Sequence, residues 1–299
     1  MRSSLVALGA TDLRVSRLAW GMWRFKGDDT AHARTLVDAA FDAGMNLFDT
    51  ADIYGFNGRD GFGDAEVLLG RLFAADPGLR GRMVLASKGG IVPGVPYDSS
   101  ADCLVAACEA SLRRLGTDHL DLFQVHRPDV LTHPAEVARA LEALVASGKV
   151  RAVGVSNYTP TQTAALVAHL QIPLASIQPE FSPLVLEPLA DGTLDLAMQH
   201  RISVLAWSPL AGGRLGAPGD DDGRAQRVCA ELDAQAQRCG VSRTAATYAW
   251  IMAHPAGIVP IVGSQQASRI REAADACKVS WTRAAWYRVL VASRGVALP

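Results

Sequence analysis

Four side chains with acid–base chemistry follow three short apolar segments of the sequence. Asp49 and Tyr54 follow the first of these segments, Lys88 ends the second, and His126 ends the third. The pKa of an isolated tyrosine is about 10, so a neighbouring ammonium that favours the phenolate makes the hydroxyl a better acid near neutral pH. Lys88 is the candidate for that ammonium, and Asp49 is the candidate for the carboxylate that holds it.

Such a set can transfer a proton to a carbonyl oxygen. The Tyr54 hydroxyl would protonate the oxygen of an aldehyde or ketone while hydride reaches the carbon, and would act as a base in the reverse direction. His126 would hydrogen-bond that oxygen and orient it. A neutral histidine and a tyrosine beside a lysine are poor metal ligands, so we expect no metal. The hydride must come from a cofactor.

The segments that carry these residues belong to a repeated pattern. Short apolar runs, each followed by a polar turn and a longer stretch with helical spacing, are typical of βα units. Eight runs predict strands at residues 17–23, 46–51, 83–89, 120–126, 150–157, 175–181, 203–210 and 257–264. Eight units in 299 residues favour a closed (β/α)8 TIM barrel, as a single domain over residues 1–299. The pattern alone also permits an open doubly wound sheet.

Two further elements flank the repeat. Residues 5–8 and 12–17 predict an N-terminal hairpin, and residues 281–293 predict a C-terminal helix. We expect both to cap the barrel. Residues 210–225 hold glycines, a proline and three consecutive aspartates, which exclude a core element and predict a mobile loop after the seventh strand.

The composition excludes several classes of protein. The formal charge is −1 and offers no extended basic face for nucleic acid. No apolar run reaches the ~18 residues of a membrane helix. Residues 1–16 lack the apolar core of a secretion signal, so we expect a cytoplasmic protein. The five cysteines are never spaced as CxxC and predict buried or idle thiols. The sequence leaves open whether the protein is a monomer or a homo-oligomer.

Further polar and aromatic residues stand at the ends of the later strands. In barrel enzymes the catalytic groups lie at the C-terminal ends of the strands, where these residues also fall. They are Ser156, Asn157, Gln178, Trp207 and Ser208. A single polar residue at a strand end commonly forms hydrogen bonds only within its own turn. The occurrence of all five residues at such positions predicts one site at the mouth of the barrel.

Six motifs resemble the aldo/keto reductase family. They are FDTADIYG (48–55), LASKGG (85–90), FQVHRPD (123–129), GKVRAVGVSNY (148–158), IQPEFSPL (177–184) and AWSPLAGGRL (206–215). The motifs follow the order of the family over nearly the whole chain. The resemblance implies that Asp49, Tyr54, Lys88 and His126 form the catalytic tetrad, with Tyr54 as acid or base. It also implies a cofactor bound on the barrel itself, which agrees with the absence of a GxGxxG motif.

The resemblance also implies which residues bind the nicotinamide and the pyrophosphate. Ser156, Asn157 and Gln178 match positions that hold the carboxamide, and Trp207 matches the position that stacks on the ring. Gly21 matches a cofactor position at the first strand end, beside Trp23, which walls the substrate pocket. The positions that fold over the pyrophosphate are Ser208, Leu210, Gly212 and Leu215.

The adenosine end bears on the choice between NADP(H) and NAD(H). Ser264 and Arg269 match residues that clasp a 2′-phosphate, which favours NADP(H) and leaves NAD(H) as the alternative. Many members of the family carry a lysine at 263–266 and an asparagine at 273. This chain has no lysine in that segment and has Ala273.

Three functions remain open at this point. The first is NADPH-dependent, reversible reduction of a small aldehyde or ketone to an alcohol. The second is a cofactor-binding regulatory or sensor protein of the potassium-channel β-subunit type, which keeps the same tetrad. The third is an enzyme that runs mainly as an alcohol or sugar dehydrogenase. The substrate depends on loops 56–63 and 89–100 and on residues 294–299, and Arg59 and Arg127 are the cations that would attract an anionic group.

Overall fold

The eight predicted strands form a closed parallel barrel. The computed structural model describes residues 5–299, and its last barrel strand pairs with the first. The barrel strands, in chain order, are β3 (Ala19–Gly21), β4 (Leu47–Asp49), β5 (Val84–Gly89), β6 (Leu120–Val125), β7 (Val150–Ser156), β8 (Leu174–Gln178), β9 (Ser203–Ala206) and β10 (Val259–Val262). Nearly every residue of these strands is buried, as expected of a parallel sheet covered on both faces. The (β/α)8 prediction is therefore confirmed.

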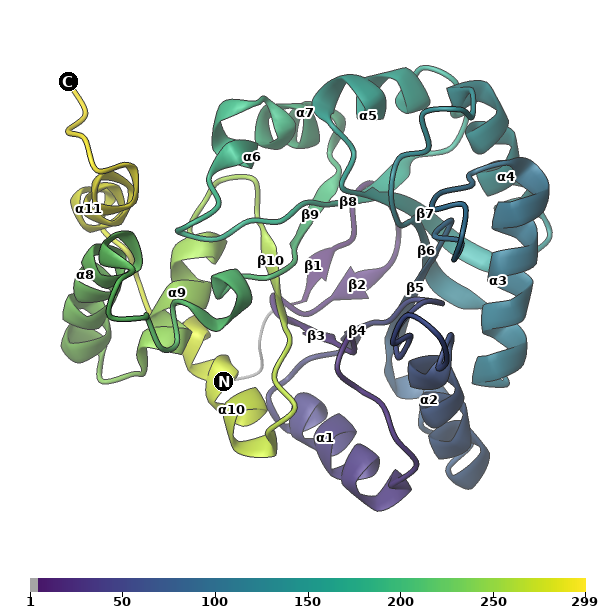
Figure 1. The fold of residues 1–299 in the computed structure, drawn as a ribbon, viewed down its shortest axis with the longest axis horizontal. Coiled ribbons are helices and arrows are strands. Elements are labelled where there is room, and N and C mark those ends of the chain that lie inside the picture. Colours follow the sequence, from purple (N-terminus) through teal and green to yellow (C-terminus); the bar gives the residue numbers. More distant parts are fainter. Residues whose placement is uncertain (1–4) are drawn as a thin grey trace.

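Helices surround the barrel on its outside (Figure 1). The helices that follow the barrel strands are α1 (Thr30–Asp42), α2 (Asp64–Ala75), α3 (Ala101–Leu115), α4 (Pro134–Ala146), α5 (Pro160–Val167), α7 (Thr193–His200), α9 (Arg243–Met252) and α10 (Ala267–Glu272). The additional helices are α6 (Glu187–Ala190), α8 (Gly223–Cys239), α11 (Arg283–Arg294) and the 3-10 turns η1 (Arg80–Arg82), η2 (Ala211–Gly213) and η3 (Ala273–Lys278). Capping residues mark the N-termini of several of these helices. Thr159 and Gln162 form a capping box on α5, and Ser242 caps α9.

The N-terminal hairpin closes one end of the barrel, as predicted. Its antiparallel strands are β1 (Val6–Ala7) and β2 (Arg14–Val15). Leu8, Leu13 and Val15 pack against the inward side chains of the barrel strands. The turn passes so close to β8 that a Cβ on Gly9, whose φ is +59°, would lie 2.5 Å from the Ala175 carbonyl oxygen. Because this end is sealed, a ligand must approach from the other end.

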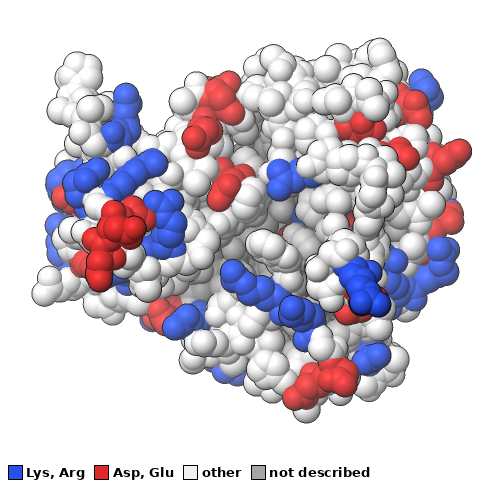
Figure 2. All heavy atoms as spheres, in the orientation of Figure 1, with Lys and Arg blue, Asp and Glu red and all other residues white. Residues whose placement is uncertain are grey.

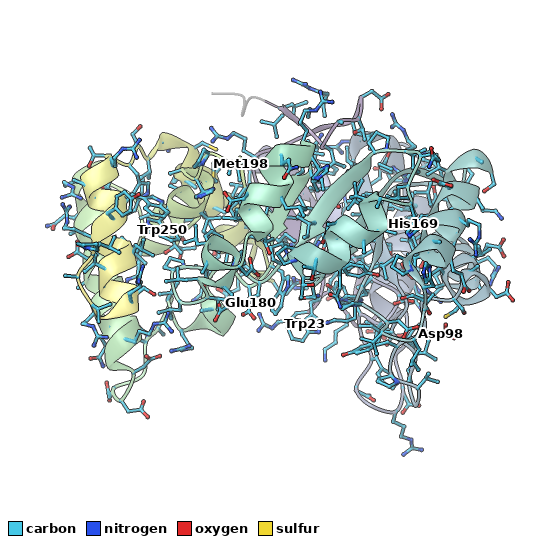
Figure 3. The ribbon with its side chains drawn as sticks, turned by 90° about the horizontal axis from the view of Figure 1, so that it is seen from above. Trp23, Asp98, His169, Glu180, Met198 and Trp250 are labelled. Atoms are coloured by element: carbon cyan, nitrogen blue, oxygen red, sulfur yellow. The ribbon has the colours of Figure 1, made fainter. Side chains whose placement is uncertain are left out.

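The C-terminal helix does not cap the barrel, contrary to our expectation. α11 packs against α8 outside the ring of barrel helices (Figure 1). The rings of Trp250 on α9 and Trp286 on α11 stack with centroids 4.6 Å apart. Each indole N–H donates to the backbone carbonyl of the other, at 3.1 and 3.0 Å. Figure 3 shows Trp250 among these helices, away from the barrel axis. The helix covers α8, which lies outside the eightfold repeat and needs its own packing partner.

The segment 210–225 contributes to the core, which corrects our expectation that it could not. Leu215 is fully buried in the main hydrophobic cluster, and Ala211 is also buried there. η2 lies within the segment and α8 begins at Gly223. The glycines and aspartates of the segment therefore flank a buried apolar residue, Leu215, whose position in the core the composition does not indicate.

The described residues contain neither a membrane-spanning helix nor a cluster of metal ligands. No helix between residues 5 and 299 is long and apolar enough to cross a membrane. In that same range, no three residues among His, Cys, Asp and Glu gather as a metal site would require. The five cysteines are unpaired, and Cys277 is exposed.

Candidate active site

Lys88 is the buried centre of the candidate site. It lies near the end of β5, and its Nζ donates to Asp49 Oδ2 at 2.7 Å, to the Thr50 carbonyl at 2.9 Å and to the Tyr54 hydroxyl at 3.0 Å. All three ammonium protons are therefore used. Burial lowers the pKa of Lys88, but Asp49 and Tyr54 raise it more, so the net pKa lies above its ordinary value. Lys88 is a permanent cation beneath the tyrosine.

Tyr54 follows β4 in a short turn and remains a protonated phenol at neutral pH. Burial raises the pKa of Tyr54 above its ordinary value, although the charge of Lys88 and its hydrogen bond lower it. The net direction is opposite to our expectation that the lysine would lower this pKa. The reason is that Lys88 is itself paired with Asp49, so its charge offsets only part of the cost of burying a phenolate.

His126 stands beside Tyr54 at the end of β6. The two rings meet edge to face, with centroids 5.8 Å apart. Burial, together with the positive charges of Lys88 and Arg127, lowers the pKa of His126 well below its ordinary value. No described residue offers its buried Nδ1 a hydrogen bond. A neutral imidazole carries one N–H, so His126 can donate one hydrogen bond near the Tyr54 hydroxyl.

Asp49 is held from its other side by amides of the barrel wall. Gln178 Nε2 donates to Asp49 Oδ1 at 2.9 Å, and Gln124 Nε2 lies 3.4 Å from the same oxygen. The Gln124 carbonyl accepts in turn from Ser176 Oγ at 3.1 Å. Gln124 stands near the end of its strand but was assigned no role in the predicted site, because its position does not reveal its partner across the barrel.

The residues predicted to hold the nicotinamide form one hydrogen-bonded chain. Ser156 Oγ donates to the Gln178 carbonyl at 2.9 Å, and Asn157 Nδ2 donates to Ser156 Oγ and to the His126 carbonyl. Trp207 Nε1 donates to Asn157 Oδ1 at 3.0 Å, which fixes the indole. Asn157 adopts a left-handed φ of 60°, a conformation that costs energy and needs such support. Its amide is therefore already engaged within the protein.

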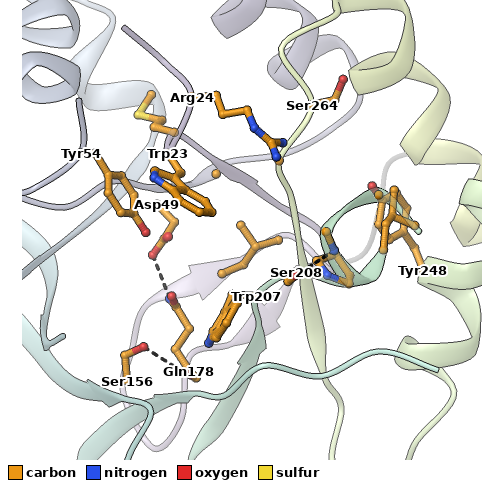
Figure 4. A pocket seen from close by; sticks show the side chains of 18 of the residues that line it. Trp23, Arg24, Asp49, Tyr54, Ser156, Gln178, Trp207, Ser208, Tyr248 and Ser264 are labelled. Atoms are coloured by element: carbon orange, nitrogen blue, oxygen red, sulfur yellow. Dashed lines mark hydrogen bonds between the residues drawn. The ribbon is translucent and has the colours of Figure 1, made fainter. Parts of the chain in front are cut away.

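These groups open onto one cavity of about 720 Å³ at the C-terminal ends of the strands, a size typical of small-molecule sites. The face in Figure 2 is hollowed near its centre, with basic side chains beside the hollow, and Figure 4 shows the lining side chains. The predicted site residues that line it are Gly21, Trp23, Asp49, Tyr54, His126, Ser156, Asn157, Gln178, Trp207, Ser208, Leu210, Gly212, Ser264 and Arg269. Trp23 stands at the rim and is 67% exposed, on the side away from the N-terminal hairpin (Figure 3).

Two predicted residues lie off this cavity. Lys88 lies directly beneath it, behind Tyr54. Leu215 is buried in the core, and its backbone N–H donates to the Leu210 carbonyl at 3.2 Å. Leu215 thus anchors the segment that lines the cavity without facing the cavity itself. At the start of that segment, Ser208 has a left-handed φ of 52° and its Oγ accepts from the Gly212 N–H.

The sequence model of the aldo/keto reductase family matches residues 17–289. The chain belongs to the aldo/keto reductase family. A protein named 6-dehydroglucose reductase, from Novosphingobium aromaticivorans, is 58% identical over 98% of this chain and 96% of its own length. A second protein of that name, from Agrobacterium fabrum, is 40% identical over 95% and 96% of the two chains. Oxidoreductase YdhF of Escherichia coli is 39% identical over 95% of each. The chain is accordingly an oxidoreductase.

The cavity of this aldo/keto reductase includes residues that the sequence patterns did not indicate. Arg24 follows Trp23 after β3, Thr244 and Tyr248 come from α9, and Glu272 comes from α10. The three helical residues fall within amphipathic helices, where the apolar periodicity indicates packing and hides a role in a cavity. Packing also requires a glycine at position 21, because a Cβ there would lie 2.6 Å from Ile261 Cγ2 on the neighbouring strand.

A second group of residues that the sequence patterns did not indicate lies behind Lys88 and contains Asp52 and Glu66. Asp52 is buried, and burial raises its pKa to about 8, with the nearby Glu66 adding to the shift. Glu66 accepts from Ser87 Oγ at 2.5 Å and from Arg114 Nε at 2.7 Å. Asp52 is thus largely neutral at pH 7, and its backbone N–H donates to the Lys88 carbonyl at 3.0 Å. This network connects the turn that carries Tyr54 to β5.

Proposed function

We propose that this chain is an NADPH-dependent reductase of a carbonyl group on a sugar-like small molecule, with Tyr54 as proton donor. One observation carries the proposal: Lys88 is within hydrogen-bond distance of both Asp49 and Tyr54, beneath a cavity that His126 also lines. The substrate class rests on the two relatives named 6-dehydroglucose reductase.

Each member of the tetrad has a separate task in this proposal. Tyr54 donates its proton to the carbonyl oxygen, and Lys88 stabilises the negative charge left on the phenol oxygen, where a hydrogen bond strengthens as charge develops. His126 is neutral and donates its N–H to the same carbonyl oxygen. Asp49 holds Lys88 in place. When bound, the nicotinamide supplies the hydride to the carbonyl carbon. The same groups run in reverse for alcohol oxidation.

The cavity residues suit NADP(H). The fixed Trp207 indole gives a flat surface for the nicotinamide ring, and Ser208, Leu210 and Gly212 line the next part of the cavity. Ser264 and Arg269 lie at its other end, where Arg269 is exposed and forms no ion pair with any residue of the described chain. An unpaired guanidinium is suited to a 2′-phosphate.

Replacing Arg269 with methionine tests the cofactor preference. We expect the Kd for NADPH to rise about tenfold or more and the Kd for NADH to stay unchanged, because only NADPH carries the 2′-phosphate. Titration with each nucleotide, followed by quenching of tryptophan fluorescence, measures both constants. Arg271→Met is the control, since Arg271 lies on the same helix but pairs with Asp42 at 3.0 Å. Equal weakening of both nucleotides by Arg269→Met would contradict the assignment.

The mouth of the cavity supports a polar substrate of modest size. Apolar walls come from Trp23, Phe56 and Ile91. Two cations line the same cavity, Arg24 beside Trp23 and Arg127 beside Trp207. Hydroxyl groups of a sugar can accept hydrogen bonds from Arg127 while the apolar walls cover its C–H faces. A glucose oxidised to a carbonyl at carbon 6 is therefore the first substrate to test.

A carbonyl panel with NADPH tests the function. We expect 6-dehydroglucose to be reduced with a kcat/KM about tenfold or more above that of an apolar aldehyde of similar size, because its hydroxyls can accept hydrogen bonds from the half-buried Arg127 and an apolar aldehyde offers none. NADPH oxidation follows the reaction, and NADP⁺ with the product alcohol tests the reverse direction. Tight binding of NADPH without reduction of any carbonyl would favour the regulatory alternative.

A further inference from the structure

Tyr248 is a buried tyrosine whose hydroxyl has no partner in the protein. It lies on α9, is 2% exposed, and lines the cavity. Across residues 5–299 no group forms a hydrogen bond with its hydroxyl. Trp250, on the same helix, shows the usual arrangement, because its N–H reaches the Trp286 carbonyl at 3.1 Å. The hydroxyl oxygen keeps some access to the cavity, so a ligand that enters there can accept a hydrogen bond from it.

The position of Tyr248 indicates which part of a ligand it meets. Figure 4 shows Tyr248 at the end of the cavity opposite Tyr54, beyond the turn that carries Ser208. Ser264 lies on the same side in that view, and Arg269 lies on α10, the helix that also carries Glu272, the charged neighbour of Tyr248. Tyr54 and Trp207 mark the nicotinamide end in the proposed function, so the Tyr248 end receives the adenosine diphosphate half of the cofactor.

The protonation state of the Tyr248 hydroxyl indicates which groups of the ligand it can bind. Burial and the nearby Glu272 raise the pKa of Tyr248, so the phenol keeps its proton and acts as a donor at neutral pH. Phosphate oxygens of the cofactor only accept hydrogen bonds, and Arg269, on the same helix as Glu272, supplies a positive charge that attracts a phosphate. The Tyr248 hydroxyl can therefore donate a hydrogen bond that a phosphate oxygen accepts.

We propose that Tyr248 is a cofactor-binding residue that donates its hydroxyl proton to a phosphate oxygen of NADP(H). The inference rests on the proposed function, since it requires a nicotinamide dinucleotide in this cavity. The cofactor-binding residues predicted from the sequence follow barrel strands, and Tyr248 would add one from a helix, α9. The two sources of phosphate oxygen are the pyrophosphate, which NADPH and NADH share, and the 2′-phosphate, which only NADPH carries.

Tyr248→Phe is the test, because it removes the hydroxyl and keeps the ring. We expect the Kd for NADPH to rise about tenfold. Calorimetric titration with NADPH, NADH and 2′,5′-ADP locates the contact. Equal weakening of NADPH and NADH supports the pyrophosphate, and 2′,5′-ADP then also weakens if the contact is to the adenosine-side phosphate, because its 5′-phosphate occupies that position. Weakening of NADPH and 2′,5′-ADP, with NADH unaffected, supports the 2′-phosphate. Tyr287→Phe is the matched control, since Tyr287 lies on the exposed side of α11 and away from the cavity.

A measurement of stability separates this role from a structural one. Because the hydroxyl has no partner in the fold, Tyr248→Phe should leave the melting temperature of the nucleotide-free protein unchanged or slightly higher. A lower melting temperature together with unchanged nucleotide affinities would overturn the proposal and assign the hydroxyl to the fold. Unchanged affinity for all three nucleotides would also overturn it. Failure of the wild-type protein to bind either NADPH or NADH would overturn the proposed function, and this inference with it.

Discussion

Tyr54→Phe is expected to lower kcat for carbonyl reduction by about 10²–10⁴-fold, the usual contribution of a positioned general acid. The variant keeps the aromatic ring against Lys88 and His126 and loses only the hydroxyl. The Kd for NADPH should change by less than about twofold, because the hydroxyl acts in the transition state and adds little to ground-state binding. Steady-state assays and nucleotide titration of the same preparation measure the two effects.

A second tyrosine provides the control for this experiment. Tyr158 is largely buried, follows Asn157, and does not line the cavity. Tyr158→Phe removes a phenol of similar burial and should leave kcat within about twofold of the wild-type value. Turnover by Tyr54→Phe close to that of Tyr158→Phe would show that the proton comes from another group. Loss of NADPH binding in Tyr54→Phe would show instead that the hydroxyl serves the cofactor.

The convergence of the tetrad could be predicted from the sequence because the fold is periodic. Parallel strands of a barrel end at one mouth, so residues that end separate apolar runs meet there whatever their distance along the chain. Asp49 and Lys88 follow this rule and lie 2.7 Å apart. The same rule predicts that Ser156, Gln178 and Trp207 lie at that mouth, and all three line the cavity. Strand ends therefore carry most of the information about the site.

Features that depend on many tertiary neighbours could not be predicted in this way. The pKa of Tyr54 rises because burial, a property of the whole fold, outweighs one nearby charge. Leu215 lies in the core although glycines and aspartates surround it in the sequence. Tyr248 and Glu272 reach the cavity from helices, where local periodicity says only that a residue faces inward or outward. Short-range patterns thus identify strand ends and miss the contributions of the surrounding helices.

Lys88→Met is expected to affect both stability and turnover. The substitution leaves Asp49 as a buried carboxylate without its counter-ion, which typically costs about 3–5 kcal/mol of the free energy of unfolding. Gln178 still donates to Asp49 at 2.9 Å, so we expect the lower end of that range. Turnover should fall as well, because no cation remains to stabilise the phenol oxygen after proton transfer. Urea unfolding and steady-state assays measure the two losses separately.

The double variant Asp49→Asn/Lys88→Met separates the two effects. Asparagine removes the uncompensated charge, so the double variant should recover part of the stability that Lys88→Met loses, and the two substitutions should be strongly non-additive. Turnover should stay low in the double variant, because neutralising Asp49 restores no cation beside Tyr54. Recovery of turnover together with stability would mean that Lys88 serves only the fold. A Lys88→Met variant as stable as the wild type would mean that Asp49 does not depend on the ion pair. The combination of restored stability and absent turnover is the result that assigns Lys88 to the chemistry of Tyr54.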